Sequence, residues 1–380
     1  MPNQNERLHA LDALRAIMML LGLVIHTAAS YMTTDLGQGW PLKDASSTHV
    51  IFDLLSGYIH GFRMPVFFAV AGFFSALLFF NQSPNRMLLN RIKRILLPFL
   101  VFLFLLWPIN AFIWTYGFSI MESSASPWQD TWNIIVNIKT YLPESSIHLW
   151  FLYYLVYFSI IAFLFGQLQN RFQKTSSAIQ SIFNAAMKYP LVRPFMFAAL
   201  AFALLFMIEN PLPEQQGKFI PNWQAFIYYL SFYMFGWLLF GSKHLIATLP
   251  KYSWILLILA IPIHFAFMVL NATGKTELII LCALHALSNW LFVFSIFGLF
   301  IRYFSQHSEV MRFISNGAYW MYLIHLPVVA FFTIALLGLD IHSSIKFLIV
   351  FLSSLFVCVI SYRYWIKKSI VSVFLNGKRY

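Results

Sequence analysis

Two residues that can do chemistry lie eleven positions apart in the apolar stretch from Leu11 to Ser30, namely Arg15 and His26. Eleven residues of α-helix make about three turns and rise about 16.5 Å, so both side chains lie on one face of the helix. A guanidinium binds phosphate well, and an imidazole can exchange a proton near neutral pH. This spacing predicts a phosphate-binding cation near one end of a helix and a titratable group near the other.

Both residues also have a structural interpretation. Arg15 can snorkel to the phosphates of the inner leaflet, and His26 can be a neutral, hydrogen-bonded packing residue. Asp12 precedes Arg15 by about one turn of helix. We expect Asp12 either to hold the guanidinium or to cap the N-terminus of the helix.

A second polar set lies in the stretch "GYIHGFRMPVFF", which contains His60, Arg63 and Pro65. The i,i+3 spacing places His60 and Arg63 on one helix face. Pro65 frees a backbone carbonyl and is expected to kink the helix, a feature that membranes tolerate where it lines a cavity. We expect His60 and Arg63 to lie at about the depth of His26.

Further histidines begin or interrupt two more apolar stretches. "HLWFLYYLV" contains His148 and Trp150, and "GAYWMYLIHLPVV" contains Tyr322 and His325. Trp150 alone is typical of an interfacial anchor, but histidines that reach one depth from several helices predict a shared polar site. His264 and His285 lack an accompanying motif and are expected to be packing residues, which leaves the site to the other histidines.

The elements that carry these residues are membrane-spanning helices. Of the 380 residues, 60% are hydrophobic and 10% are charged, whereas a soluble domain has roughly 25% charged residues. We therefore expect an all-α polytopic membrane protein with a single domain over residues 1–380. Stretches of about 20 apolar residues predict ten spans, at 10–31, 57–80, 95–115, 148–169, 194–209, 223–241, 253–271, 278–301, 313–337 and 344–364.

The basic residues predict the orientation of these helices. With both termini cytoplasmic, 18 of the 25 Lys and Arg residues fall on the cytoplasmic side, five fall outside, and Arg15 and Arg63 remain within spans. This is the asymmetry that membrane insertion produces. The net charge of +12 then reflects topology and the anionic inner leaflet, and no nucleic-acid partner is expected.

The chain resembles the acyltransferase 3 family of integral membrane acyltransferases. The first helix of that family carries R-x10-H, seen here as Arg15 and His26. The other sequence motifs that carry the resemblance are "IHGFRMPVFFAVAGFFS", "NRIKRILLP", "HLWFL" and "YLIHLP". The first of these contains His60 and Arg63.

The resemblance implies a multi-pass enzyme of the bacterial cytoplasmic (inner) membrane. It would move an acyl group, with succinyl favoured over acetyl, from cytoplasmic acyl-CoA to a hydroxyl of an extracytoplasmic carbohydrate such as a periplasmic glucan. Acyl-CoA is then a substrate, and no permanently bound cofactor or metal is expected. The expected donor-binding residues are Arg15, Asp12, Arg91 and Arg94, and the expected acceptor-side residues are His148, Trp150, Tyr322 and His325.

In this scheme His26 is the catalytic residue, with Arg63 and His60 beside it. His26 either acts as general base on the acceptor hydroxyl or carries the acyl group covalently. Arg63 or His60 donates to the oxyanion, and Arg63 is the cation that could meet a succinyl carboxylate. The polar residues leave two other classes open, a secondary transporter and a non-catalytic subunit of a glycan export or assembly complex. The oligomeric state is not indicated by the sequence.

Overall fold

The computed structural model of the chain describes residues 4–213 and 217–377, and within these ranges it contains helices and connecting segments but no β-strand. The predicted all-α fold is confirmed. Lys378 and Arg379, which contribute to the predicted basic side, lie outside the described residues.

The apolar stretches of the sequence form the long helices of the fold. They are α1 (Gln4–Ala29), α2 (Val50–Asn81), α4 (Leu97–Met121), α6 (Trp150–Arg171), α8 (Arg193–Met207), α9 (Trp223–Gly241), α11 (Ser253–Thr273), α12 (Leu278–Tyr303), α13 (Glu309–Ala335) and α14 (Ser343–Ser361). The remaining helices are α3 (Pro84–Arg91), α5 (Pro127–Ile135), α7 (Gln173–Met187), α10 (Lys243–Ile246) and α15 (Ile370–Asn376).

Eight helices of the described residues are long and apolar enough to cross a membrane, so the prediction of ten is not confirmed. The two exceptions are α8 and α9. Helix α8 has only 15 residues, which at 1.5 Å per residue covers about 22 Å of a core about 30 Å thick. Helix α9 has 19 residues, but its Tyr, Trp, Gln and Ser residues lower its hydropathy. Since α8 and α9 are consecutive, leaving out both does not change the predicted side of any other helix. The cytoplasmic location of both termini stays a prediction.

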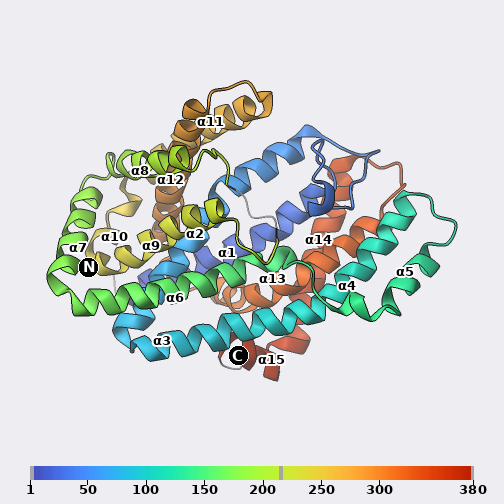
Figure 1. Cartoon of the computed structure of the whole chain (residues 1–380), viewed down its shortest axis with the longest axis horizontal. Helices are drawn as coiled ribbons and strands as arrows, with labels where there is room; N and C mark the ends of the chain where they lie inside the picture. The colour runs from blue at the N-terminus through green and yellow to red at the C-terminus, as the bar shows by residue number, and fades with distance from the viewer. Residues whose placement is uncertain (1–3, 214–216, 378–380) are drawn as a thin grey trace.

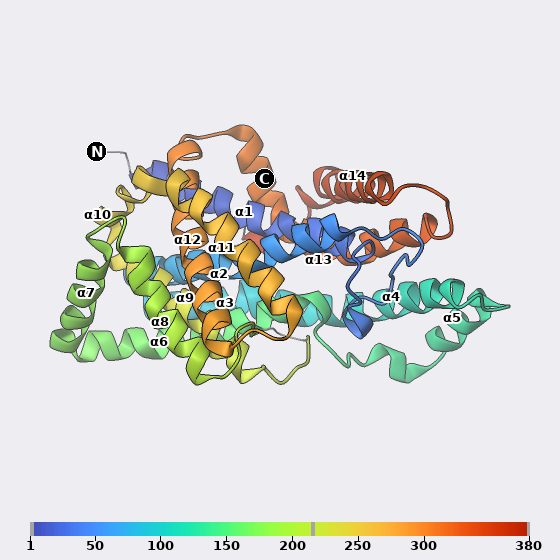
Figure 2. The same cartoon turned by 90° about the horizontal axis from the view of Figure 1, so that it is seen from above.

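The helices form an elongated bundle in which α1, α2 and α13 occupy the middle (Figure 1). Figure 2 shows α4 and α5 extending from one end of the bundle and α7 and α10 at the other. Helix α1 packs against α13 and α2, while α2 also packs against α9, α12 and α6. Helices α1 and α2, which carry residues that the sequence singled out, therefore lie in the middle of the bundle (Figure 1).

Small residues allow α2 and α9 to pack closely. A Cβ atom at Gly72 of α2 would lie 1.9 Å from the carbonyl oxygen of Tyr233, and one at Gly236 of α9 would lie 1.7 Å from that of Ala69. Close backbone contact of this kind is how membrane helices gain packing energy, since lipid offers no hydrophobic driving force between them. On the same face of α2, the Phe68 ring contacts Phe151 and Phe158 of α6.

The basic segment "NRIKRILLP" is helical rather than a loop. Ser83 caps α3 by accepting a hydrogen bond from the backbone N–H of Arg86 at 3.2 Å. A π-helical turn over Ile92–Leu96 then joins α3 to α4. A π turn shifts the side-chain positions within a helix and is frequent at functional sites. Here Arg91 directly precedes the turn and Arg94 lies within it.

Candidate acyl-transfer site

Three histidines from three different parts of the chain meet in the interior. His26 comes from α1, His148 from the short turn before α6, and His325 from α13. The centroid of the His26 ring lies 5.2 Å from that of His325 and 6.4 Å from that of His148. The rings of His148 and His325 lie 5.1 Å apart. We call His26, His148 and His325 the histidine cluster.

Backbone carbonyls determine the tautomers of two of these rings. His148 Nε2 donates to the carbonyl of Leu323 at 3.1 Å, and His325 Nδ1 donates to that of Tyr322 at 2.6 Å. In a neutral imidazole the other nitrogen carries a lone pair. His148 Nδ1 and His325 Nε2 are those nitrogens, and neither has a hydrogen-bond partner among the described residues. The cluster therefore offers acceptor sites, while the His26 side chain is half-buried and accessible.

Tyr322 joins the elements that carry the cluster. Its hydroxyl donates to the carbonyl of His148 at 2.7 Å, and its ring lies 5.6 Å from the His148 ring. These contacts fasten α13 to the start of α6. Tyr322 thus lies beside the cluster, as its position in the sequence suggested, but its hydroxyl is engaged by a backbone oxygen.

Arg63 belongs to α2, and its side chain reaches α1 next to the cluster. Its Nε donates to the carbonyl of Met18 at 2.8 Å, so the carbonyl it binds belongs to α1 and not to the turn freed by Pro65. A Cβ at Gly22 would lie 2.6 Å from Arg63 Nη2 and 3.5 Å from His325 Nε2. The guanidinium and the His325 imidazole therefore meet above Gly22, and the two terminal nitrogens of Arg63 form no hydrogen bond with the described residues.

This contact predicts that Gly22→Ala lowers turnover by about tenfold to a hundredfold, the range expected when a reacting or binding group is moved by about 1 Å. The added methyl group would displace the end of a flexible side chain rather than backbone, so the variant should still fold. Turnover and size-exclusion elution measured on the same preparation check this. Wild-type turnover in a well-folded Gly22→Ala protein would contradict the placement of Arg63.

Two residues expected near the cluster make no ring contact with it among the described residues. His60 Nδ1 donates to the carbonyl of Ser56 in its own helix at 2.9 Å, and its ring makes no contact with the rings of the cluster within the described parts of the chain. Trp150 packs against Tyr154 and Tyr229, at 5.3 Å and 6.0 Å between ring centroids. The closest partners of these two side chains are therefore other residues than the rings of the cluster.

Three arginines line a cavity of about 320 Å³ at the other end of α1. Arg15 comes from α1, Arg91 is the last residue of α3, and Arg94 lies within the π turn. The lining of this cavity also includes Met19, Phe74, Asn90, Ser315, Asn316, Tyr319 and Asn376. The sequence predicted that the three arginines share a role, and the fold gathers them around one space.

The three arginines differ in how many of their guanidinium nitrogens are already bound to other groups of the protein. Arg15 forms an ion pair with Asp12 at 3.3 Å, and both side chains are about half exposed. Because α1 begins at Gln4, Asp12 does not cap the helix. Arg91 Nη2 donates to Ser75 Oγ at 2.8 Å, while its buried Nε lacks a partner among the described residues.

Arg94 is the most engaged of the three. It donates to the carbonyls of Val373 and Phe374 at the end of α15. Of the three guanidinium groups, Arg15 and Arg91 are therefore the better placed to bind an anion in the cavity.

The cavity and the histidine cluster are linked along α1. A second, small cavity of about 10 Å³ is lined by Leu23, Tyr322 and His325 together with Met19, which also lines the arginine cavity. Along the face of α1, Arg15 is followed after one turn by Met19, then by Gly22 and Leu23, and then by His26. A flexible chain bound in the arginine cavity would reach the cluster by passing Met19.

One residue beside the cluster was not predicted from the sequence. Trp40, in the segment between α1 and α2, is 2% exposed, and its ring lies 5.6 Å from the His26 ring. Nothing in the sequence marks this position, because the segment is neither apolar nor periodic. The two histidines set aside as packing residues are buried: His264 contacts Ser288 and the carbonyl of Gly57, and His285 contacts Asn289.

Comparison with known proteins identifies the family to which the chain belongs. An acyltransferase domain model matches residues 8–363. Glucans biosynthesis protein C of Escherichia coli strain K12 is 26% identical over 346 residues, which cover 87% of this chain and 84% of that protein. The protein of the same name from Salmonella schwarzengrund is 27% identical over 337 residues, covering 86% and 83%. No solved structure matches the chain. The chain therefore belongs to the acyltransferase 3 family and is a multi-pass membrane acyltransferase.

Proposed function

We propose that this protein transfers an acyl group, succinyl in preference to acetyl, from acyl-CoA on the cytoplasmic side to a hydroxyl of an extracytoplasmic carbohydrate. One observation carries the proposal: a cavity lined by arginines and a cluster of histidines lie at opposite ends of the same helix face. The relatives named for glucan biosynthesis favour a glucan as the acceptor. Such an acceptor implies the inner membrane of a bacterium.

In this proposal the arginine cavity binds the phosphates of CoA. Arg15 and Arg91 have nitrogens free for such contacts, and charge-assisted bonds to phosphate are about twice as strong as neutral ones. The pantetheine arm passes Met19 and carries the thioester toward His26. The arm suits this path because it is a narrow, flexible chain.

The histidine cluster and Arg63 then support the transfer itself. His26 accepts the proton of the acceptor hydroxyl while that oxygen attacks the thioester carbonyl. A C–O bond forms, and the C–S bond breaks as the resulting oxyanion collapses, while the terminal nitrogens of Arg63 bind the carboxylate of the succinyl group. The CoA thiolate leaves and takes up the proton from His26. In the covalent variant of this route, His26 itself attacks the thioester, the C–S bond breaks and the CoA thiolate leaves. The acceptor hydroxyl then attacks the acyl-imidazole, the C–N bond breaks, and the proton of the hydroxyl passes to the released imidazole or to the thiolate.

The test is transfer of radiolabel from acyl-CoA to a soluble glucan by the purified protein in detergent. The proposal predicts label in the glucan, at a higher rate from succinyl-CoA than from acetyl-CoA. A transporter would need a sealed vesicle to show any activity, and a non-catalytic subunit would transfer no label in either system. Absence of transfer in detergent from both donors would therefore overturn the proposal.

The donor site gives a separate prediction. Arg15→Ala should raise the KM for acyl-CoA by about tenfold or more, with a smaller effect on turnover at saturating donor, because a phosphate contact made equally in ground and transition states appears in KM. The matched control is Lys93→Ala, since Lys93 is an exposed cation between Arg91 and Arg94 that does not line the cavity. Equal donor affinity of the Arg15→Ala variant and the wild type, measured by direct binding, would remove Arg15 from the donor site.

A further inference from the structure

The segment between α1 and α2, residues 30–49, folds against the outer end of the histidine cluster. It contains a single short helical turn, Gly37–Gly39, and is otherwise irregular. Its Trp40 is fixed by a hydrogen bond from Nε1 to Ser30 Oγ at 2.8 Å. The indole so fixed lies against the His26 imidazole, with ring centroids 5.6 Å apart and planes inclined by 31°. We call residues 30–49 the strap.

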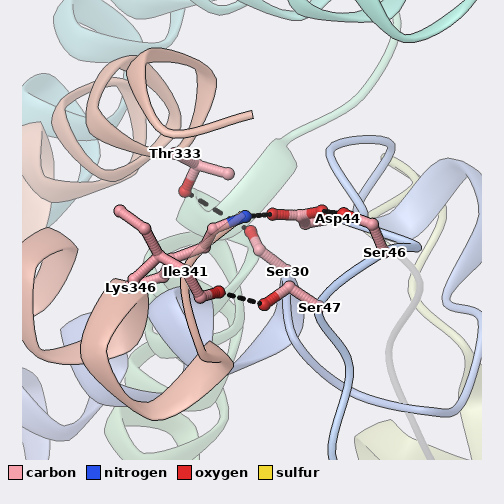
Figure 3. A network of polar contacts seen from close by, with 7 residues as sticks. All are labelled: Ser30, Asp44, Ser46, Ser47, Thr333, Ile341 and Lys346. Atoms are coloured by element: carbon pink, nitrogen blue, oxygen red, sulfur yellow. Dashed lines mark hydrogen bonds and ion pairs between the residues drawn. The ribbon is translucent and has the colours of Figure 1, made fainter. Parts of the chain in front are cut away.

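A buried ion pair holds the strap to the far end of the chain. Lys346 Nζ of α14 lies 2.6 Å from Asp44 Oδ2, and the two side chains are 0% and 5% exposed. The other carboxylate oxygen, Asp44 Oδ1, accepts from Ser46 Oγ at 2.8 Å. Figure 3 shows the pair between the strap and α14. Removing one partner of a buried ion pair leaves an unpaired charge in the interior, which costs free energy. The Asp44–Lys346 pair therefore holds the strap in this position.

Two weaker contacts accompany the ion pair. Ser47 Oγ donates to the carbonyl of Ile341 at 3.0 Å, and Ser30 Oγ lies 3.4 Å from Thr333 Oγ1 (Figure 3). Ser30 is also the residue that accepts the hydrogen bond of Trp40. The same small network therefore connects α13 and α14 to the indole that contacts His26.

We propose that Trp40 is a positioning residue that holds the His26 imidazole in the orientation needed for acyl transfer, and that the Asp44–Lys346 ion pair fixes the strap that carries it. At 2% exposure, Trp40 has no free face on which a sugar ring could stack, so its effect is exerted through His26. This inference rests on the proposed function in so far as it assigns the transfer step to His26. The contact between strap and imidazole can be tested without that step.

The experiment compares Trp40→Leu and Asp44→Asn with two matched controls. Trp128→Leu removes an exposed outer tryptophan of α5, and Lys43→Met removes a strap cation that donates to the carbonyl of Thr33. Two quantities are measured: the kinetic constants for transfer, and the rate at which diethyl pyrocarbonate modifies His26, read by peptide mass spectrometry. His307, a half-exposed histidine far along the chain, serves as the internal reference for the reagent.

Both strap variants should lose about tenfold or more in turnover, because a misoriented reacting group costs roughly this much or more, while the KM for acyl-CoA stays as in the wild type. The rate of modification at His26 should rise severalfold relative to His307. Both controls should match the wild type in both measurements. If Asp44→Asn does not fold, the doubly neutral Asp44→Asn, Lys346→Met variant takes its place, since it buries no unpaired charge.

The outcomes are distinguishable from failure of the proposed function. A wild-type protein that transfers no acyl group removes the proposed function, yet faster modification of His26 in Trp40→Leu would still support the strap contact. Unchanged modification in a folded Trp40→Leu protein would overturn the inference. So would faster modification with full turnover, since orientation of His26 would then not matter to transfer.

Discussion

Replacement of His26 by alanine is expected to lower acyl transfer by about 10²–10⁴-fold, the usual contribution of a general base. His26 is the histidine of the cluster that is half-buried and accessible, and it extends the face of α1 that begins at Arg15. Loss of one imidazole from the wall of a site should leave the bundle intact. Turnover with saturating labelled donor is the measurement, and the variant should elute as a monodisperse peak.

The matched control for this variant is His285→Ala. His285 is also a buried histidine within a spanning helix, but it contacts Asn289 and Phe267 away from the cluster. The His285→Ala variant should keep most of the wild-type turnover even if its stability falls. Retention of more than about a tenth of wild-type turnover by His26→Ala would assign His26 a structural role.

The two chemical routes through His26 can be separated in the wild-type protein. Incubation with labelled acyl-CoA and no acceptor leaves label on the polypeptide only if the acyl group passes through an acyl-imidazole. General-base catalysis leaves the polypeptide unlabelled.

Replacement of Arg63 by glutamine is expected to reduce succinyl transfer by about a hundredfold, while transfer from acetyl-CoA falls by less than about tenfold, in line with the loss of one well-placed charged donor. Succinyl differs from acetyl by a terminal carboxylate, which is costly to bury unless a cation meets it. Arg63 Nε donates to the carbonyl of Met18, and its terminal nitrogen Nη2 lies next to Gly22, near His325 Nε2. That orientation suits bidentate binding of a carboxylate.

The matched variant is Arg63→Lys, which keeps the charge but lacks the planar fork. It should recover only part of the succinyl transfer lost in Arg63→Gln. Equal loss with succinyl-CoA and acetyl-CoA in Arg63→Gln would rule out the carboxylate role and leave Arg63 as the donor to the oxyanion or as a packing residue.

Much of the fold is predictable because hydropathy and helix formation are local properties. Each of the ten apolar stretches is helical over most of its length. What local properties did not settle is whether α8 and α9 cross the membrane, since one is short and the other rich in Tyr and Trp. Helices α5 and α7 were not expected at all, because their polar residues conceal an amphipathic pattern that matters only when packed or at a surface.

The sequence by itself determined what lies along one helix. The distance between Arg15 and His26 and their common face follow from the regular geometry of α1. The i,i+3 spacing of His60 and Arg63, and the expected depth of the histidines in several apolar stretches, added Arg63 and the other histidines as candidates. None of these relations depends on how one helix packs against another.

Only the tertiary structure decided which candidates meet. His148 and His325 join His26, whereas His60 and Trp150 do not, because rotation about each helix axis is set by packing with its neighbours. The pairing of Asp44 with Lys346 joins residues 302 positions apart, and the contact of Trp40 with His26 depends on an irregular segment. Contacts of this kind arise from the closure of many helices around one interior, and no periodicity within a single segment encodes them.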